Sequence, residues 1–290
     1  MRLDHLAVYA RCVAAVCLLA TTNHTLAQCL GKAASKAQPL TFAVVPQLPA
    51  ALIYARWAPI LQRVGNDTDL CFDLQIPPSV PAFETQLLKG KPDLAFANPY
   101  HAVMAHRERG YLPLLADGHR KAIGILVVKK NGPITKLSDL KGQTVDFPAP
   151  NAFAASLLIR AALSKMGIHI SPNYAKTHSN VYRSVIIGDA VAGGGIKNIL
   201  LNEPAEIQNQ LSVIFETPAY MPHPIIANPK LVESIRSKFT AAFIALKADP
   251  ETARLLEAIQ VTDPIRVDYK KDYAPLEKLG LEKYVVLEKN

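Results

Sequence analysis

The chain has 290 residues, half of them apolar, and ordinary proportions of proline and glycine, so it can bury a substantial core and is neither disordered nor fibrous. Its formal charge of +8 favours anionic ligands. Its basic pairs lack interleaved aromatic residues and no nucleic-acid motif accompanies them, so nucleic acid is not expected as a partner. One large domain or two lobes would fit this length.

The first 27 residues are typical of a targeting segment. Arg2 and Arg11 precede the apolar run 13–20, and small residues before Gln28 suit cleavage there. The run is far shorter than the roughly 20 residues of a membrane-spanning helix, so we expect an exported, periplasmic protein. A lipid anchor on Cys29 is an alternative, which Gln28 disfavours because the lipoprotein signal needs a small residue there.

Two cysteines remain after the expected cleavage. In an oxidising compartment, Cys29 and Cys71 have one available connectivity, a bridge from the mature N-terminus to a predicted strand. Two unpaired thiols are the alternative.

The residues that follow alternate between predicted strands and helices. A buried strand at 40–45 leads through the loop 46–49 into a helix with apolar residues at helical spacing. A strand at 70–76, a helix at 82–89 and a strand at 93–97 come next. This alternation predicts a mainly parallel sheet covered on both faces.

A second unit repeats this pattern after a strongly apolar strand at 123–128. Its predicted elements are a strand at 144–147, a helix at 152–166, a strand near Tyr174, a helix at 180–187 and a short strand at 191–192. Two units in series predict two lobes with a cleft between them. Helices at 231–246 and 250–259 are expected to pack back on the first lobe.

The strongest functional signal lies at 147–156. A strand runs through Pro150 and Asn151 into an alanine-rich helix, whose first backbone amides have no partner within the helix. Such a helix start binds anions, and Asn151 is its predicted N-cap. Nucleophile, zinc-hydrolase and phosphate-loop motifs do not occur, and the histidines and cysteines lack metal-site spacing. We therefore expect a binding protein without a cofactor or metal, and not an enzyme.

Five ordered segments resemble the phosphate/phosphite/phosphonate periplasmic binding proteins of ABC transporters, over nearly all of residues 40–284. The segments are 42–47, 90–99, 137–144, 177–179 and 216–222.

This resemblance implies an α/β, two-lobed type II periplasmic-binding-protein fold, with two chain crossings near 118–124 and 215–224. The expected division is a signal peptide at 1–27, lobe 1 at 28–121 and 220–290, and lobe 2 at 122–219. The lobes would close on a small oxyanion of phosphate, phosphite or phosphonate type, and a monomer would deliver it to an ABC permease. The alternative is a sensing subunit that presents the bound ligand to a membrane receptor such as a histidine kinase.

Two departures from the family pattern concern the ligand. Where the family has Ser-Thr-Ser-Gly, this chain has Ala152-Phe153-Ala154-Ala155, so only backbone amides can bind the anion and the ligand is expected to be larger or less polar than phosphate. The glycines 193–195 stand where many relatives have an acidic residue for an amino group, which disfavours an aminoalkylphosphonate. The same glycines could admit a ligand close to the backbone.

The resemblance and the strand ends supply the candidate ligand contacts. His178 matches the family's histidine and would donate to the anion, more strongly when protonated in mildly acid surroundings. Tyr100 and His101 follow a predicted parallel strand, where ligands of α/β sheets bind. For each candidate, a role in the core or on the surface is the alternative. The expected set is Gln47, Tyr54, Asn98, Tyr100, His101, Asn151, Ala152, Phe153, Ala154, His178, Tyr182 and Tyr220, with Arg120, Arg183 and His223 as weaker candidates nearby.

Overall fold

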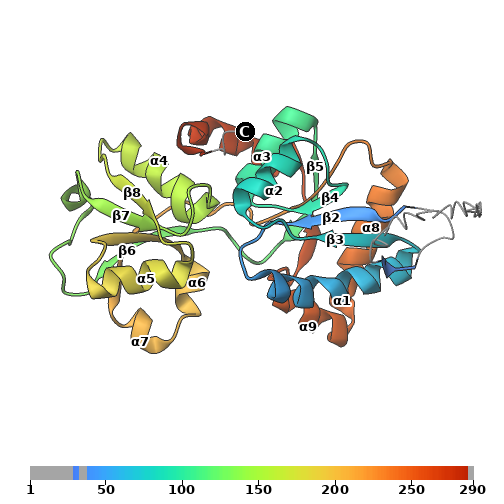
Figure 1. The fold of residues 1–290 in the computed structure, drawn as a ribbon, viewed down its shortest axis with the longest axis horizontal. Helices are drawn as coiled ribbons and strands as arrows, with labels where there is room; N and C mark the ends of the chain where they lie inside the picture. The colour runs from blue at the N-terminus through green and yellow to red at the C-terminus, as the bar shows by residue number, and fades with distance from the viewer. Residues whose placement is uncertain (1–28, 33–37, 287–290) are drawn as a thin grey trace, which may run out of the picture.

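The structure is a computed structural model that describes residues 29–32 and 38–286, and it forms two lobes, each built on its own sheet (Figure 1). The predicted signal peptide lies outside the described residues. Among the residues described, no helix is both long and apolar enough to cross a membrane.

Lobe 1 is built on a seven-stranded mixed sheet. Its strands, in spatial order, are β1 (Leu30–Gly31), β3 (Cys71–Gln75), β2 (Leu40–Val44), β4 (Leu94–Phe96), β11 (Ile225–Ala227), β5 (Leu112–Asp117) and β12 (Pro264–Arg266). Strand β2 pairs in parallel with β3 and β4, whereas β11 is antiparallel to both of its neighbours. The sheet is therefore mixed rather than mainly parallel, because β11 enters from the other lobe in the opposite direction.

Helices cover both faces of this sheet. They are α1 (Ala50–Thr68), α2 (Val80–Leu88), α3 (Pro99–Arg109), α8 (Glu233–Ala245) and α9 (Pro250–Ala258). The short helical turn η3 (Leu246–Ala248) lies between α8 and α9, and η4 (Tyr269–Tyr273) and η5 (Ala274–Leu279) come after them. Figure 1 shows α1 and α9 on one face and α2 and α3 on the other. The Phe42 ring of β2 lies 5.1 Å from the Trp57 ring of α1 and 6.2 Å from the Phe239 ring of α8. Burial of each such side chain contributes roughly 1.5–3 kcal/mol, so these rings join the sheet to its helices.

A disulfide joins Cys29 to Cys71, with their Cα atoms 5.2 Å apart. It ties β1 to its neighbour β3 at the edge of the lobe 1 sheet. Of the two states that the sequence left open, the structure has the bridge, and the Cys29 sulfur is then not available for a lipid.

Lobe 2 is built on a five-stranded mixed sheet. Its strands, in spatial order, are β10 (Leu211–Glu216), β6 (Gly124–Lys129), β9 (Ala192–Ile196), β7 (Thr144–Phe147) and β8 (Ser171–Tyr174). Its helices are η1 (Leu137–Leu140), η2 (Phe153–Leu157), α4 (Leu158–Lys165), α5 (His178–Ile187), α6 (Lys197–Leu201) and α7 (Ala205–Gln208). The predicted helix at 152–166 thus begins as one π turn, η2, and continues as α4.

The glycines of β9 serve packing and not ligand approach. A Cβ atom at Gly194 would collide with the Ala155 carbonyl and the Phe147 ring, and one at Gly195 would collide with the Tyr182 hydroxyl. All three glycines, 193–195, are buried and pair with β6 in the middle of the sheet. The expectation that they admit a ligand is wrong, because η2 and α5 occupy the space beside them.

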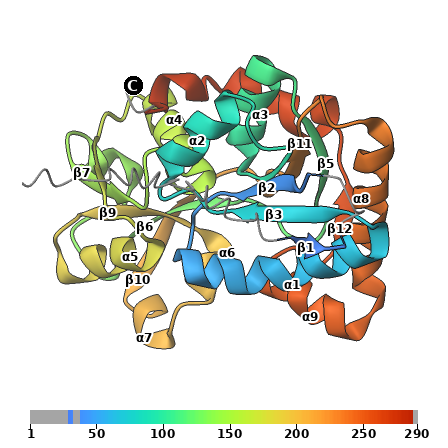
Figure 2. The same ribbon diagram turned by 45° about the vertical axis from the view of Figure 1, so that its right-hand side comes forward.

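The chain passes between the lobes after β5 and again after β10. The two crossing segments pair at Ala122 and Tyr220, whose amides each donate to the other's carbonyl at 2.9 and 3.1 Å. The C-terminal turn η6 (Leu281–Tyr284) then lies beside α4 of lobe 2 (Figures 1 and 2). Arg160 of α4 donates to the Tyr284 carbonyl at 2.8 Å. The turn η6 therefore contacts lobe 2 through Arg160 and lobe 1 through Tyr100, whose hydroxyl donates to Glu282 at 3.5 Å. The sequence predicted a return of this part of the chain to lobe 1.

Candidate functional site

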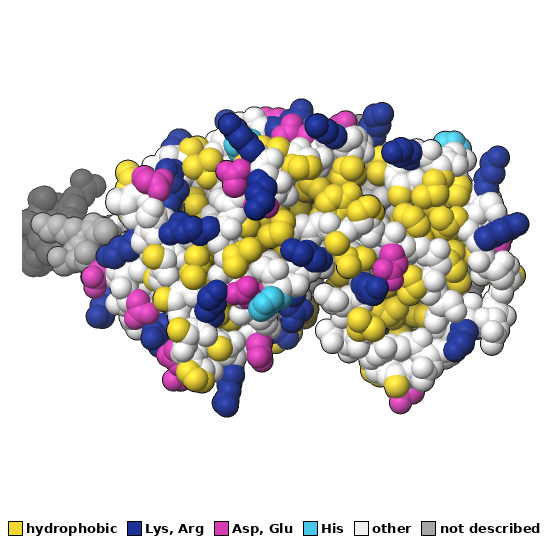
Figure 3. All heavy atoms as spheres, turned by 180° about the vertical axis from the view of Figure 1, so that it is seen from behind, with side chains coloured by type: hydrophobic (Ala, Val, Ile, Leu, Met, Phe, Trp, Pro, Cys, Tyr) yellow, Lys and Arg dark blue, Asp and Glu magenta, His cyan; other side chains and the backbone are white. Residues whose placement is uncertain are grey.

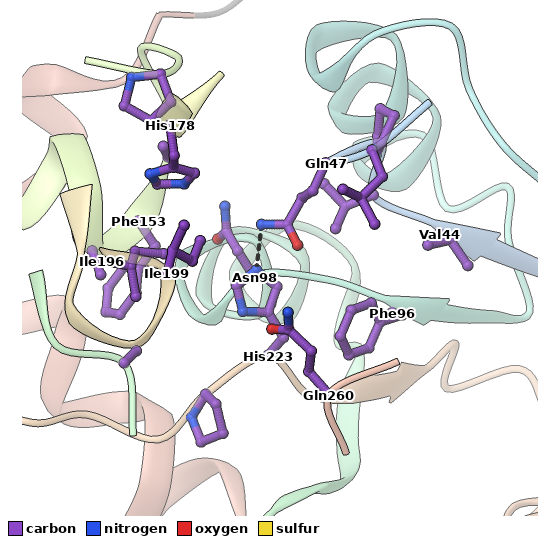
Figure 4. A pocket seen from close by; sticks show the side chains of 18 of the residues that line it. Val44, Gln47, Phe96, Asn98, Phe153, His178, Ile196, Ile199, His223 and Gln260 are labelled. Carbon is purple, nitrogen blue, oxygen red and sulfur yellow. Dashed lines mark hydrogen bonds between the residues drawn. The ribbon is translucent and has the colours of Figure 1, made fainter. Parts of the chain in front are cut away.

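A cavity of about 570 Å³ lies between the lobes. Lobe 1 contributes Gln47, Phe96 and Asn98 to its lining, and lobe 2 contributes Phe153 and His178 from the facing side (Figure 4). In the view from behind, a notch separates the lobes along the lower edge (Figure 3). This volume falls in the range of small-molecule sites, so the cleft predicted from the sequence can hold a ligand.

The start of η2 forms part of the lobe 2 wall. Ala152, Phe153 and Ala154 line the cavity. The amides of Ser156 and Leu157 both donate to the Ala152 carbonyl, at 2.9 and 3.0 Å. Among the described residues, the amides of Phe153, Ala154 and Ala155 have no acceptor in the preceding loop or in a side chain. These three unpaired donors lie at the positive end of the helix dipole, and the two whose residues line the cavity, Phe153 and Ala154, are available to an anion.

The helix start lies close to the lobe 2 sheet because two strands have glycine there. A Cβ atom at Gly124 would collide with the Ala154 carbonyl, as one at Gly194 would with that of Ala155. The carbonyls of the first turn thus face the sheet. Ala155 itself is fully buried and does not line the cavity, so its amide lies behind those of the two residues before it.

His178 lies on the same wall, at the first position of α5. Thr177 caps this helix by accepting the Asn180 amide at 3.1 Å, which places the imidazole at the cavity. The Nδ1 atom is covered by protein and has no hydrogen-bond partner among the described residues. Burial lowers the pKa of His178 to about 4. The imidazole is therefore neutral in mildly acid surroundings when the cavity is empty, so the protonation that would strengthen its role as a donor does not occur in the empty protein at such pH.

A buried carboxylate organises the floor of the cavity. Glu84 of α2 accepts from the Asn151 side chain at 2.9 Å through both oxygens, and one of these lies 2.8 Å from Nε2 of His101. Asn98 caps α3 by accepting the His101 amide at 2.7 Å, and its own side chain donates to the Asn151 carbonyl at 3.1 Å. All four residues are at most 4% exposed. Asn98, His101 and Asn151 line the cavity as predicted, but their polar groups are engaged with one another.

The predicted N-cap role of Asn151 is wrong. Ala152 occupies the N-cap position without a side-chain bond. The Asn151 side chain turns instead to Glu84 and to Val286, donating to the Val286 carbonyl at 2.8 Å and accepting its amide at 2.9 Å. A buried carboxylate requires donors, which explains this orientation.

The family model for "ABC transporter, phosphonate, periplasmic substrate-binding protein" matches residues 42–273. The chain belongs to this family. Its members are binding components of importers, and their two-lobed fold is the one described above. No curated protein matches the chain.

Several solved structures share the fold of this member of the family. A binding protein component of an ABC phosphonate transporter from Pseudomonas aeruginosa is 18% identical, with a TM-score of 0.72 over 85% of this chain and 87% of that one. PhnD1 from Prochlorococcus marinus in complex with methylphosphonate is 16% identical, with a TM-score of 0.74 over 84% and 97%. A Xanthomonas citri protein bound to ATP is 16% identical, with a TM-score of 0.71 over 86% and 100%. At these identities the likeness shows the fold.

The tyrosines predicted as ligand contacts do not line the cavity of this family member. Tyr100 is 2% exposed, and burial raises its pKa to about 12. Tyr182 lies under Gly195 in the lobe 2 core. Tyr220 packs its ring edge against Phe153, with centroids 5.9 Å apart, and so supports the wall from behind. The residues of α1 that line the cavity are one helical turn apart and so share one face of the helix. Tyr54 lies on another face and does not line the cavity.

The remaining weaker candidates divide between the cavity and the surface. Arg120 and His223 line the cavity, whereas Arg183 lies in a separate shallow groove on α5. Gln47 lines the cavity as predicted, and its side-chain nitrogen is 3.0 Å from Nε2 of His223. Burial, with a smaller contribution from His101, lowers the pKa of His223 to about 3, so this side chain is neutral at pH 7.

Several lining residues carried no functional signal in the sequence. Arg56, Lys121 and Lys176 add positive charge, and Gln260 follows the end of α9 with a left-handed φ of 63°. Elsewhere Lys and Arg side chains are spread over the face seen in Figure 3. No three His, Cys, Asp or Glu side chains of the described residues come together as a metal site. The cavity is therefore suited to an anion through backbone amides, one imidazole and surrounding cations.

Proposed function

We propose that this chain is a periplasmic solute-binding protein that captures an oxyanion of phosphonate type between its lobes and delivers it to an ABC permease. One observation carries the proposal: the unpaired amides of Phe153 and Ala154 and the imidazole of His178 line one cavity from one wall. Backbone amides at a helix start bind oxyanions, and the low dielectric of a buried cleft strengthens such hydrogen bonds.

The same geometry supports the proposal that the lobes close on the ligand. The Ala122–Tyr220 pair joins the two crossings, and rotation about these segments would open the cleft. A ligand that contacts both lobes stabilises the closed form by its differential affinity for the two states. We take residues 28–121 and 220–290 as lobe 1, residues 122–219 as lobe 2, and the protein as a monomer.

The test is calorimetric titration with phosphate, phosphite, methylphosphonate and phenylphosphonate. We expect saturable binding of at least one of them, loss of that binding in Ala154→Glu, and retention in Ala241→Glu, a control on the exposed face of α8. A carboxylate beside the two amides repels an anion, whereas one on α8 does not. The proposal fails if none of the four oxyanions binds, or if Ala154→Glu binds as tightly as the wild-type protein.

A further inference from the structure

The cavity offers an oxyanion at most one free hydroxyl donor among its described lining residues. Thr177 and Ser179 are the two hydroxyl side chains in its described lining. The Thr177 oxygen accepts the Asn180 amide at 3.1 Å, which leaves its own O–H free to donate, whereas the Ser179 hydroxyl donates to Glu203 at 2.5 Å. A bare tetrahedral oxyanion presents acceptors in every direction and loses the solvation of those that stay unpaired. Hydroxyl groups therefore contribute at most one hydrogen bond to such an ion.

The cavity also has no free carboxylate for an amino group. Asp117 is the one acidic residue in the described lining, and it is 1% exposed. One of its oxygens accepts the Arg120 amide at 2.5 Å, and the other accepts the Thr262 hydroxyl at 2.9 Å and the Asp263 amide at 3.0 Å. A cationic group on the ligand would meet Arg56, Arg120 and Lys176 without a counter-charge.

Apolar side chains enclose the space around the amides. Ile53, Trp57 and Phe96 line it from lobe 1, and Phe153, Ile196 and Ile199 line it from lobe 2. Figure 4 shows Phe96 on one side and Phe153, Ile196 and Ile199 on the other. The volume of about 570 Å³ corresponds to roughly 20 water molecules at about 30 Å³ each, and a tetrahedral oxyanion fills a small part of it. Apolar walls beside the amides of Phe153 and Ala154 suit an apolar substituent on the anion.

We propose that the ligand is an organic oxyanion, an alkyl- or arylphosphonate with an apolar substituent larger than methyl and without an amino group. This inference rests on the proposed function and specifies the ligand of the same site. The phosphonate oxygens accept from the amides of Phe153 and Ala154 and from the His178 imidazole. The substituent lies between Phe96 and Ile199, where it replaces water.

The test is a calorimetric titration series with methyl-, propyl-, phenyl- and 2-aminoethylphosphonate on the wild-type protein. Each further buried methylene tightens binding about fourfold, so propylphosphonate should bind up to about 15-fold tighter than methylphosphonate. Phenylphosphonate should also bind tighter than methylphosphonate. The nearly isosteric 2-aminoethylphosphonate should bind at least about tenfold more weakly than propylphosphonate, because its ammonium group loses water without a partner.

A pair of variants locates the substituent. Ile199→Asn should bring the propyl-to-methyl ratio of affinities toward one, while Ile187→Asn, at a residue 69% exposed and outside the cavity, should leave that ratio unchanged. Equal affinity for methyl-, propyl- and phenylphosphonate, or tighter binding of 2-aminoethylphosphonate, would overturn the inference and leave the proposed function standing. Failure of every phosphonate to bind would instead overturn the proposed function.

Discussion

Asn151 of lobe 2 donates its side-chain amide to both carboxylate oxygens of Glu84 in lobe 1, at 2.9 Å each. The two residues are 2% and 1% exposed. Burial of a carboxylate costs several kcal/mol of free energy unless donors surround it. Because Asn151 donates to Glu84 from the other lobe, this pair stabilises the contact between the lobes beside the cavity.

Removal of the Asn151 side chain should destabilise the protein. Asn151→Ala leaves Glu84 with His101 and breaks both bonds to Val286, so we expect the free energy of unfolding to fall by about 1–3 kcal/mol. Urea denaturation measures the change. Asn209→Ala, at an exposed position on the surface, is the control, and an equal loss in both variants would contradict the role of the pair.

Arg160 fixes the C-terminal turn to lobe 2. Its guanidinium donates to the carbonyls of Pro150 and Tyr284 and to the Ser156 hydroxyl, at 2.5, 2.8 and 3.1 Å, and lies 5.6 Å from the centre of the Tyr284 ring. A lysine cannot reproduce this planar set of donors, so Arg160→Lys should lower the free energy of unfolding by about 1–3 kcal/mol. The exposed Arg254→Lys is the matched control in the same thermal and urea experiments. A stability equal to that of the control would show that the contacts contribute nothing.

The Gly194 position couples the sheet to the anion site. Gly194→Ala pushes against the Ala155 carbonyl and should cost about 1–3 kcal/mol of stability through overpacking, while also weakening phosphonate binding because the helix start moves. Gly142→Ala serves for comparison. A Cβ atom at Gly142 would meet no other atom within 4 Å, but the backbone φ of 75° should make the alanine cost about 1–2 kcal/mol of stability. This substitution should not affect binding. Unchanged phosphonate affinity in a folded Gly194→Ala protein would contradict this coupling.

His178 makes anion binding depend on pH with a definite sign. Its pKa is about 4 in the empty protein because burial disfavours the charged form. A bound anion raises the pKa of the imidazole, so binding takes up a proton. The affinity therefore increases as the pH falls through the raised pKa, by up to about tenfold for each pH unit between the pKa values of the bound and empty protein.

The measurement compares the wild-type protein with His178→Gln between pH 5 and 8. The ligand titrates identically in both, so the ratio of their affinities isolates the histidine. We expect the ratio to increase toward pH 5 in favour of the wild-type protein. A ratio that stays constant over this range would mean that the imidazole does not face the anion.

The alternation of strands and helices and the helix start at 152–154 could be predicted from the sequence, because buried strands and breaks before alanine-rich helices depend on local residue patterns. Strand β11 was not predicted, and its antiparallel direction depends on the second crossing and not on its own three residues. The predicted strand near 191–192 extends through the glycines of β9, whose strand conformation follows from the packing of η2 and α5.

Within the site, the sequence indicated His178 because it follows a strand and matches a family motif. Tyr100, Tyr182 and Tyr220 do not line the cavity, because an amphipathic ring near a strand end can pack in a core as well as in a cleft. Tyr100 and Tyr182 are buried, and Tyr220 packs against Phe153. Glu84 carried no signal, since a glutamate in a helix is usually solvated. In the structure its carboxylate is buried and contacts His101 and, from the other lobe, Asn151.

The most direct test of the proposed anion-binding site is a crystal structure of the protein with phenylphosphonate. We predict that the phosphonate oxygens lie within hydrogen-bonding distance of the Phe153 and Ala154 amides and of the His178 imidazole, with the phenyl ring between Phe96 and Ile199. A phosphonate bound outside the cleft, or bound within it away from these two amides, would contradict the account.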